Sequence, residues 1–295
     1  MRVFVTGAAG FIGSATTKEL IAHGHHVVGL ARNDANVETL KKLGAEVHRG
    51  DLNDVESLKS AAKNADGVVH CAFIHDFSKF VENGQIDKRA IEAMGSVMEG
   101  TNKPLIVTSG VAMISPGEFA TEDMMRHQPG MPRMSEAAVF GFTDRGVRTM
   151  AIRLPQVHGG EGKAGFIGYL FDVAREKGVS AYVGDGSNRW SAAHRLDVAR
   201  CYRLALEKGA AGKAYHAVSD SSVPVRDLAH VFAKILNVKT KSLTPEEAGV
   251  HFGFMGMFAG LDMPASSAKT QAELGWTPKE IGVIEDISRP GYFGV

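Results

Sequence analysis

Three closely spaced glycines near the start of the chain constrain its fold more strongly than any other feature. They lie in the run Val3-Phe4-Val5-Thr6-Gly7-Ala8-Ala9-Gly10-Phe11-Ile12-Gly13, which joins a short apolar strand to a segment with helical spacing of apolar residues. In such a turn Gly7 permits the tight bend, Gly10 lets backbone amides approach a ligand, and Gly13 lets the helix pack against the sheet. Because a helix N-terminus attracts negative charge, the pattern predicts a site for the pyrophosphate of a dinucleotide.

The segments that follow alternate between apolar strands and helices. Strands are predicted at 26–31, 45–48, 67–71, 104–108 and 147–154, and helices at 11–22, 37–43, 54–62, 87–98 and 133–145. Strands that are almost continuously apolar are typical of a parallel sheet covered on both faces. The sequence therefore predicts an α/β fold with a doubly wound parallel Rossmann sheet in residues 1–159. Residues 160–295 are predicted to form mainly a smaller C-terminal substrate lobe, with some elements returning to the Rossmann core.

Composition narrows the classes of partner. The lysines and arginines together number 33, as do the aspartates and glutamates, so the chain has no net charge. Binding to nucleic acid or to an anionic membrane is therefore not expected. The two cysteines, Cys71 and Cys201, form no CxxC pair, and no apolar leader precedes the first strand. Both features favour the cytoplasm. Residues 70 and 71 point to opposite faces of a strand, which argues against a zinc site at His70, Cys71 and His75. A small-molecule substrate is the expected partner.

The end of the second strand indicates which dinucleotide is bound. Enzymes that use NAD place a carboxylate about 20 residues beyond the glycines, where this chain has Ala31 and Arg32. Arg32 can form charge-assisted bonds to the 2′-phosphate of NADP, whereas Asp34 is a competing carboxylate for the NAD ribose. We predict NADP, with NAD as the alternative. After the third strand, Asp51 either accepts a hydrogen bond from the adenine or caps the next helix.

Together with the glycine turn, several later segments resemble the extended short-chain dehydrogenase/reductases, which include sugar-nucleotide epimerases and dehydratases. The resemblance covers nearly the whole chain, and the glycine motif is its most specific part. The other segments are Gly50-Asp51-Leu52, His70-Cys71-Ala72, Thr108-Ser109-Gly110, Arg153-Leu154-Pro155-Gln156-Val157-His158-Gly159 and Leu274-Gly275-Trp276-Thr277-Pro278.

The resemblance implies a role for each matching position. The pyrophosphate would contact Gly7, Gly10, Phe11, Ile12 and Gly13, the adenine would lie beside Asp51 and Leu52, and Cys71, Ala72 and Phe73 would form the edge of the cofactor pocket. Thr108 and Ser109 would lie beside the nicotinamide ribose, Pro155 against the nicotinamide, and Gln156 at the substrate. A homodimer would form through the helices predicted at 87–98 and 133–145.

The chain departs from this family at the catalytic residues. Members usually carry Tyr-x-x-x-Lys, in which the lysine lowers the pKa of the phenol. None of the five tyrosines here has a lysine four residues later, and Pro129 stands at the tyrosine position if Arg133 replaces the lysine. Gly110 stands where the family has a catalytic serine. The sequence is therefore identified as an atypical member.

Three ionisable residues are candidates for the missing chemistry. His127 can act as a general acid, because imidazole titrates near neutral pH, or it is an exposed loop histidine. Arg133 donates no proton at pH 7, but it can hold a ribose, a phosphate or a developing oxyanion, or it is a surface charge. His158 follows a strand end, where ligands bind in open α/β sheets, and is predicted to line the substrate pocket.

A second group of candidates lies in the C-terminal half. Arg189 can act as an anion clamp, and Trp190 is either a flat surface for substrate or a residue that packs the lobe. The resemblance implies that this region, including His194, forms the far wall of the substrate site. Asp197 is predicted to cap the helix that continues to Leu206.

The function predicted from these features is an NADP-binding oxidoreductase that reduces a carbonyl on a small organic substrate. Its proton donor would be His127, His158 or water. One alternative is an NAD(P)-sensing protein without turnover, which would explain the missing Tyr and Lys. Another is an epimerase, isomerase or dehydratase that recycles its cofactor. The substrate itself is not predictable, because the pocket depends on segments 113–132 and 250–264.

Overall fold

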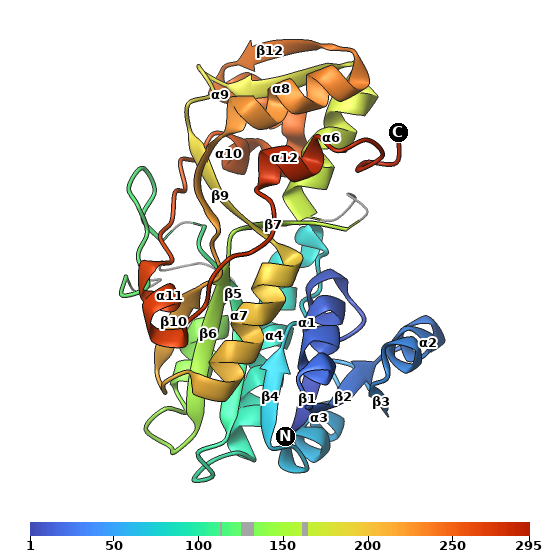
Figure 1. Cartoon of the computed structure of the whole chain (residues 1–295), viewed down its shortest axis with the longest axis vertical. Helices are drawn as coiled ribbons and strands as arrows, with labels where there is room; N and C mark the ends of the chain where they lie inside the picture. Colours follow the sequence, from blue (N-terminus) through green and yellow to red (C-terminus); the bar gives the residue numbers. More distant parts are fainter. Residues whose placement is uncertain (113, 125–132, 161–164) are drawn as a thin grey trace.

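A seven-stranded parallel sheet forms the centre of the N-terminal half (Figure 1), in the order β10-β6-β5-β4-β1-β2-β3. The computed structural model describes residues 1–112, 114–124, 133–160 and 165–295. Every neighbouring pair in this sheet is parallel, which confirms the predicted doubly wound Rossmann architecture. The strands are β1 Arg2–Thr6, β2 His26–Ala31, β3 Glu46–Arg49, β4 Gly67–His70, β5 Pro104–Gly110, β6 Arg148–Leu154 and β10 Lys213–His216.

Helices cover both faces of this sheet, because successive residues of each strand point to opposite sides. Val3 and Val5 of β1 face one hydrophobic cluster, to which α1, α2, α7 and α11 contribute, while Phe4 faces a second cluster beneath α3, α4 and α5. The helices are α1 Phe11–Ala22, α2 Asp34–Leu43, α3 Val55–Lys63, α4 Phe80–Ser96, α5 Ser135–Phe140, α7 Arg195–Lys208 and α11 Ala268–Leu274.

The C-terminal half forms a smaller lobe around its own hydrophobic cluster, in which the rings of Phe171 and Phe293 stack with centroids 3.8 Å apart. One sheet has the order β11-β9-β7 and another pairs β12 with β8. The strands are β7 Gln156–His158, β8 Val179–Val183, β9 Arg189–His194, β11 Asp220–Pro224 and β12 Lys239–Leu243. The helices are α6 Gly165–Lys177, α8 Val225–Leu236, α9 Pro245–Phe252, α10 Gly256–Ala259 and α12 Val283–Ile287.

The chain passes repeatedly between the two halves. Helix α7, strand β10 and helix α11 belong to the Rossmann half although they lie far along the sequence, and α7 packs beside α1 (Figure 1). Residues from both halves of the sequence therefore lie near the start of α1.

Several helix boundaries differ from those predicted. Helix α4 begins at Phe80 rather than at residue 87. Its first turns were not predicted because Asn83 and Gly84 interrupt the apolar pattern there. The Asn83 side chain donates to Asp76 O. Helix α5 ends at Phe140, with turns following to Gly146. In the C-terminal lobe, α9 ends at Phe252, before Gly253, whose φ is +58°, and α10 follows as a separate helix. Among the described residues, every helix is too short or too polar to cross a bilayer.

Candidate nucleotide site and active site

The glycine turn has a geometry that only glycine tolerates. Gly7 has φ +66°, and the amide of Gly10 donates to Gly7 O over 2.8 Å. A Cβ at Gly13 would lie 2.0 Å from Gly7 O, and a Cβ at Gly7 would lie 2.8 Å from the amide nitrogen of Ala72. The turn, the first residues of α1 and the backbone after β4 are therefore in direct contact.

The start of α1 is built to accept an anion. Its N-cap, Gly10, makes no side-chain capping bond, and its first turn contains no acidic residue. The free amides of a helix N-terminus attract negative charge, and the close glycines let a pyrophosphate approach them. A dinucleotide thus fits the residues present: Gly7, Gly10, Phe11, Ile12 and Gly13 surround this position.

The residues after β4 adjoin this turn. The amide of Ala72 donates to Thr6 Oγ1 over 3.2 Å, and Cys71, Ala72 and Phe73 are half-buried. Burial raises the pKa of the Cys71 thiol to about 11, so Cys71 is neutral near pH 7. Its contribution to the site is therefore shape and not nucleophilic chemistry.

The structure separates the two interpretations of Asp51. Asp54 is the N-cap of α3, where its Oδ1 accepts from the Ser57 amide over 3.0 Å. Asp51 accepts instead from the amide of Asn53 over 2.6 Å, in the turn after β3, so it does not cap the helix. Leu52 is buried in the cluster under α3.

A pair of arginines lies at the ends of β2 and β3. Arg32 is exposed directly after β2, and Arg49 ends β3 opposite Ala31 of β2. Asp34, the competing carboxylate, hydrogen-bonds Arg49, and this bond lowers the pKa of Asp34. Asn33 caps α2. Sequence reasoning missed Arg49, although its place at the end of the neighbouring strand was a usable signal.

Arg133 lies between the ends of β4 and β5. Its Nη2 donates to Thr108 O over 2.8 Å and its Nε donates to Ser135 Oγ over 3.1 Å. The guanidinium carbon is 4.2 Å from the centre of the Phe73 ring. Burial lowers the pKa of Arg133, partly offset by the charge of Asp87, and the residue as a whole is half-buried. The guanidinium is thus held in one orientation at the edge of the sheet where ligands bind in this fold.

A buried polar chain, here called the Asp87 network, connects Arg133 to the glycine turn. Ser135 Oγ donates to Asp87 Oδ2 over 2.6 Å, and Asp87 Oδ1 lies 3.1 Å from His70 Nε2. His70 Nδ1 is 2.7 Å from Thr6 Oγ1. All four residues are at most 2% exposed. Buried polar groups need such partners, so this network fixes the relative positions of the turn and Arg133.

Asp87 keeps its charge in this network. Burial raises the pKa of its carboxyl, but the hydrogen bond and charge of His70, with smaller effects from Arg133 and Ser135, outweigh burial and lower it overall. An ionised Asp87 therefore supports the cationic guanidinium near it. Sequence reasoning missed this residue, because a single aspartate in an otherwise ordinary helix gives no sign of its partner.

The predicted ribose side of the pocket contains no available phenol among the described residues. Thr108 Oγ1 donates to His70 O over 2.8 Å and lies 2.6 Å from Tyr202 Oη. Burial raises the pKa of Tyr202 well above its usual value, so this phenol stays neutral. Ser109 is 2% exposed and Pro155 is buried at the start of the β6–β7 connection. Tyr202 therefore does not replace the catalytic tyrosine.

The two histidine candidates have different outcomes. His127 lies outside the described residues. His158 is 1% exposed, and its Nδ1 lies 2.7 Å from Asp286 Oδ2. Its ring is 5.3 Å from that of His194, centre to centre. His158 thus lies inside the C-terminal lobe rather than on a pocket wall, and its geometry does not support a role as proton donor.

The other substrate candidates are largely structural in their contacts. Arg189 Nε and Nη2 donate to the two carboxylate oxygens of Asp262 over 2.9 and 2.6 Å. Trp190 is 1% exposed within the core of the lobe, which favours the packing interpretation. Gln156 is half-buried in β7, opposite Ala192 of β9.

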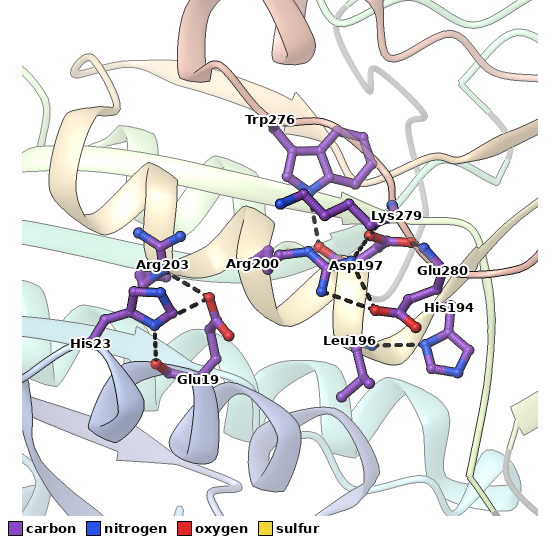
Figure 2. A network of polar contacts seen from close by, with 10 residues as sticks. All are labelled: Glu19, His23, His194, Leu196, Asp197, Arg200, Arg203, Trp276, Lys279 and Glu280. Carbon is purple, nitrogen blue, oxygen red and sulfur yellow. Dashed lines mark hydrogen bonds and ion pairs between the residues drawn. The ribbon is translucent and has the colours of Figure 1, made fainter.

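Helix α7 begins differently from the prediction. His194 is its N-cap and accepts from the Leu196 amide over 3.3 Å, so the prediction that Asp197 caps the helix is wrong. Figure 2 shows the Asp197 carboxylate turned toward the C-terminal segment, where it accepts from the amides of Lys279 and Glu280 over 2.8 and 3.0 Å. Trp276 Nε1 donates to Asp197 O over 2.9 Å.

Arg153 and Glu136 form a buried ion pair near Met124. Arg153, 1% exposed, donates to both oxygens of Glu136 over 2.9 and 2.8 Å, and to Met124 O over 2.9 Å. Its Nη1 is 3.2 Å from His216 Nε2. Burial, followed by the charge of Arg153, lowers the pKa of His216 to about 4, so His216 is neutral and accepts from Arg153 at pH 7.

With this geometry established, comparison with known proteins identifies the family. Residues 3–219 match the model of the NAD dependent epimerase/dehydratase family. The chain belongs to this family. The similarity to known proteins extends beyond the Rossmann half. An uncharacterized protein of Schizosaccharomyces pombe is 44% identical to this chain, over 99% of this chain and 100% of that protein.

More distant relatives have named activities. A 2-alkyl-3-oxoalkanoate reductase of Stenotrophomonas maltophilia is 28% identical, over 77% of this chain and 73% of its own. The solved structure of dTDP-glucose 4,6-dehydratase from Streptomyces venezuelae with NAD and TYD bound has a TM-score of 0.79 and 20% identity, and covers 99% of this chain and 96% of its own. The latter likeness concerns the fold alone. The family is named for NAD-dependent enzymes, and the dehydratase structure contains NAD, in agreement with the glycine turn.

Proposed function

We propose that this family member binds NADP and reduces a carbonyl group on a small organic substrate. The observation that carries the proposal is the position of Arg133, a half-buried residue whose guanidinium lies between the ends of β4 and β5. Ligands of open α/β sheets bind at this edge, so a substrate carbonyl there would meet a fixed cation. The reductase among the relatives supports the same reaction class.

Different residues would bind the cofactor and stabilise the charge that develops on the substrate. The glycine turn and the start of α1 would hold the pyrophosphate, and the nicotinamide, when bound, supplies the hydride. Arg133 would stabilise negative charge that develops on the carbonyl oxygen, and the Asp87 network would keep its guanidinium in place. Arginine does not release a proton near pH 7. The proton would therefore come from His127 or from water.

The test is a carbonyl-compound screen with NADPH, followed by kinetics of Arg133→Met and Arg133→Lys. We expect wild-type protein to oxidise NADPH, and Arg133→Met to lower kcat by about 10²–10³-fold, the usual effect of losing one group that stabilises the oxyanion. Arg133→Lys retains charge without the planar fork and should recover part of that loss. Asp172→Asn, which breaks only the exposed pair with Arg175, serves as the control variant.

Other outcomes would favour the alternatives. Binding of NADPH without turnover over a broad panel would indicate a sensing protein, which the neutral, buried Tyr202 also suits. Product release with no net change in NADPH would indicate an epimerase, isomerase or dehydratase. Equal kcat for Arg133→Met and the wild type would contradict the assigned role of Arg133.

The preference for NADP follows from the ends of β2 and β3. Arg32 is exposed, and the competing carboxylate, Asp34, accepts from Arg49, so the Arg32 guanidinium would be available to the 2′-phosphate. We expect Arg32→Glu to reduce the ratio of NADPH to NADH affinity by roughly 10- to 100-fold, because a charge-assisted hydrogen bond contributes about 1.5–3 kcal/mol. Calorimetric titration with both coenzymes measures the ratio. An unchanged ratio would remove Arg32 from the nucleotide site.

A further inference from the structure

We infer that Arg195 is a cofactor-binding residue, whose guanidinium binds the pyrophosphate of the dinucleotide held at the start of α1. The inference depends on the proposed function, because it concerns the same nucleotide site. It adds a contact from the far end of the sequence, since Arg195 is the first residue of α7.

The position of Arg195 is set by two neighbours. Its guanidinium carbon is 5.4 Å from the centre of the ring of Phe11, the first residue of α1. A Cβ on Gly160 would lie only 2.8 Å from the same guanidinium carbon. The side chain of Arg195 thus lies between the start of α1 and the Gly159-Gly160 turn that follows β7. Glycine at position 160, where φ is +78°, leaves the space that the guanidinium occupies.

The guanidinium of Arg195 lacks a counter-charge within the part of the chain that the structure describes. Its Nε is buried without a hydrogen-bond partner, and no described carboxylate pairs with it. Arg200 Nε is also buried without an acceptor, so ion pairing makes the difference within this helix: Arg200 pairs with Asp197 and Glu280, and Arg203 pairs with Glu19 and Glu207. A buried N–H without an acceptor is costly, so the geometry of Arg195 suits an anionic ligand.

The first turn of α1 also lacks a negatively charged partner. It has no acidic residue and no side-chain cap, so its amides and the Arg195 guanidinium, which lies 5.4 Å from the centre of the Phe11 ring, are two positive groups near the start of α1. One dianionic pyrophosphate at the start of α1 would satisfy both. Arginine suits this task better than lysine, because its planar fork offers paired donors to phosphate oxygens.

Helix α7 holds Arg195 in place before any ligand binds. Figure 2 shows the anchoring contacts, with Asp197 and Arg200 directed toward the segment of Trp276, Lys279 and Glu280 on one side, and Arg203 directed toward Glu19 of α1 on the other. The Arg203 Nε donates to Glu19 Oε1 over 2.8 Å. Because α7 is fixed both to the C-terminal segment and to α1, little ordering remains for ligand binding to impose on its first turn.

The test compares Arg195→Gln with Lys208→Gln by calorimetric titration. Lys208 is an exposed residue at the other end of α7, so both variants lose one positive charge from the same helix. The ligands are NADPH, NADH and adenosine 2′-monophosphate, which lacks the pyrophosphate. We expect Arg195→Gln to weaken NADPH and NADH binding roughly 10- to 100-fold and to leave adenosine 2′-monophosphate unchanged. Lys208→Gln should bind all three like the wild type.

A second variant guards against a folding defect. Gly160→Ala leaves Arg195 in the sequence but places a methyl group against its guanidinium, and should also weaken both coenzymes selectively. Thermal unfolding without ligand checks that each variant is folded. If Arg195→Gln bound NADPH and NADH within about twofold of the wild-type affinity, the inference about Arg195 would be wrong but the proposed function would stand. The same holds if its affinity for adenosine 2′-monophosphate fell as much as its affinity for the coenzymes. Wild-type protein that binds neither coenzyme would overturn the proposed function as well.

Discussion

Replacing Arg153 with leucine is expected to lower the free energy of unfolding by about 3–5 kcal/mol. Arg153 is buried and donates to both oxygens of Glu136 and to the carbonyl of Met124. The substitution removes these donors and leaves the Glu136 carboxylate without its guanidinium partner in a low-dielectric interior. Urea denaturation followed by tryptophan fluorescence, at constant m-value, measures the loss.

An exposed ion pair provides the matched control. Arg175 and Asp172 are each about half exposed, so Arg175→Leu should cost no more than about 1 kcal/mol. The double variant Arg153→Leu, Glu136→Leu should be more stable than Arg153→Leu alone, because it removes the uncompensated charge. If Arg153→Leu cost no more than Arg175→Leu, the Arg153–Glu136 pair would contribute nothing beyond an exposed one.

The Rossmann half could be predicted because its signals are local. A strand, a glycine turn, a helix and a second strand within residues 3–31 suffice to identify the first βαβ unit, and the continuous apolar strands specify a covered parallel sheet. Each glycine of the turn has a steric reason that is independent of distant residues, apart from the contact of Gly7 with the backbone at Ala72. Local periodicity was less reliable at α4, where polar Asn83 and Glu82 occupy the first turn.

The surroundings of His158, Trp190 and Arg189 could not be predicted, because they come from distant parts of the chain. His158 precedes two glycines at a strand end, yet its partner is Asp286, 128 residues later. Trp190 is surrounded by helices of the C-terminal lobe, and Arg189 meets Asp262 from another loop. No local pattern distinguishes an arginine that is free in solvent from one, such as Arg189, that pairs with a carboxylate 73 residues away.

The same argument applies to Arg195 and Asp87. Arg195 lies beside Phe11 at the start of α1 only because α7 returns to pack beside α1, and Asp87 contacts His70 only because α4 covers the strand that precedes it. In both cases the sequence shows a polar residue in a helix, while the function depends on which strand or helix lies opposite. The return of α7 is thus the step by which the C-terminal half reaches the nucleotide site.

Gly13→Ala is expected to reduce the affinity for NADPH by at least about 100-fold, since overpacking of a rigid site costs up to about 3 kcal/mol or more. The added Cβ would lie 2.0 Å from Gly7 O, which is a backbone atom and can move only if the whole turn moves. The amides at the start of α1 would then no longer converge on one position. Calorimetric titration with NADPH measures the loss, and circular dichroism checks that the variant is folded.

Two other glycine substitutions separate a specific effect from a general one. A Cβ at Gly10 would lie 3.2 Å from Gly7 O, a milder contact, so Gly10→Ala should bind NADPH with an affinity between those of the wild type and Gly13→Ala. A Cβ at Gly249 in α9 would meet no atom within 4 Å, so Gly249→Ala should bind NADPH like the wild type. Wild-type affinity in folded Gly13→Ala would mean that the dinucleotide is held elsewhere, because no pyrophosphate site at this turn could survive displacement of Gly7.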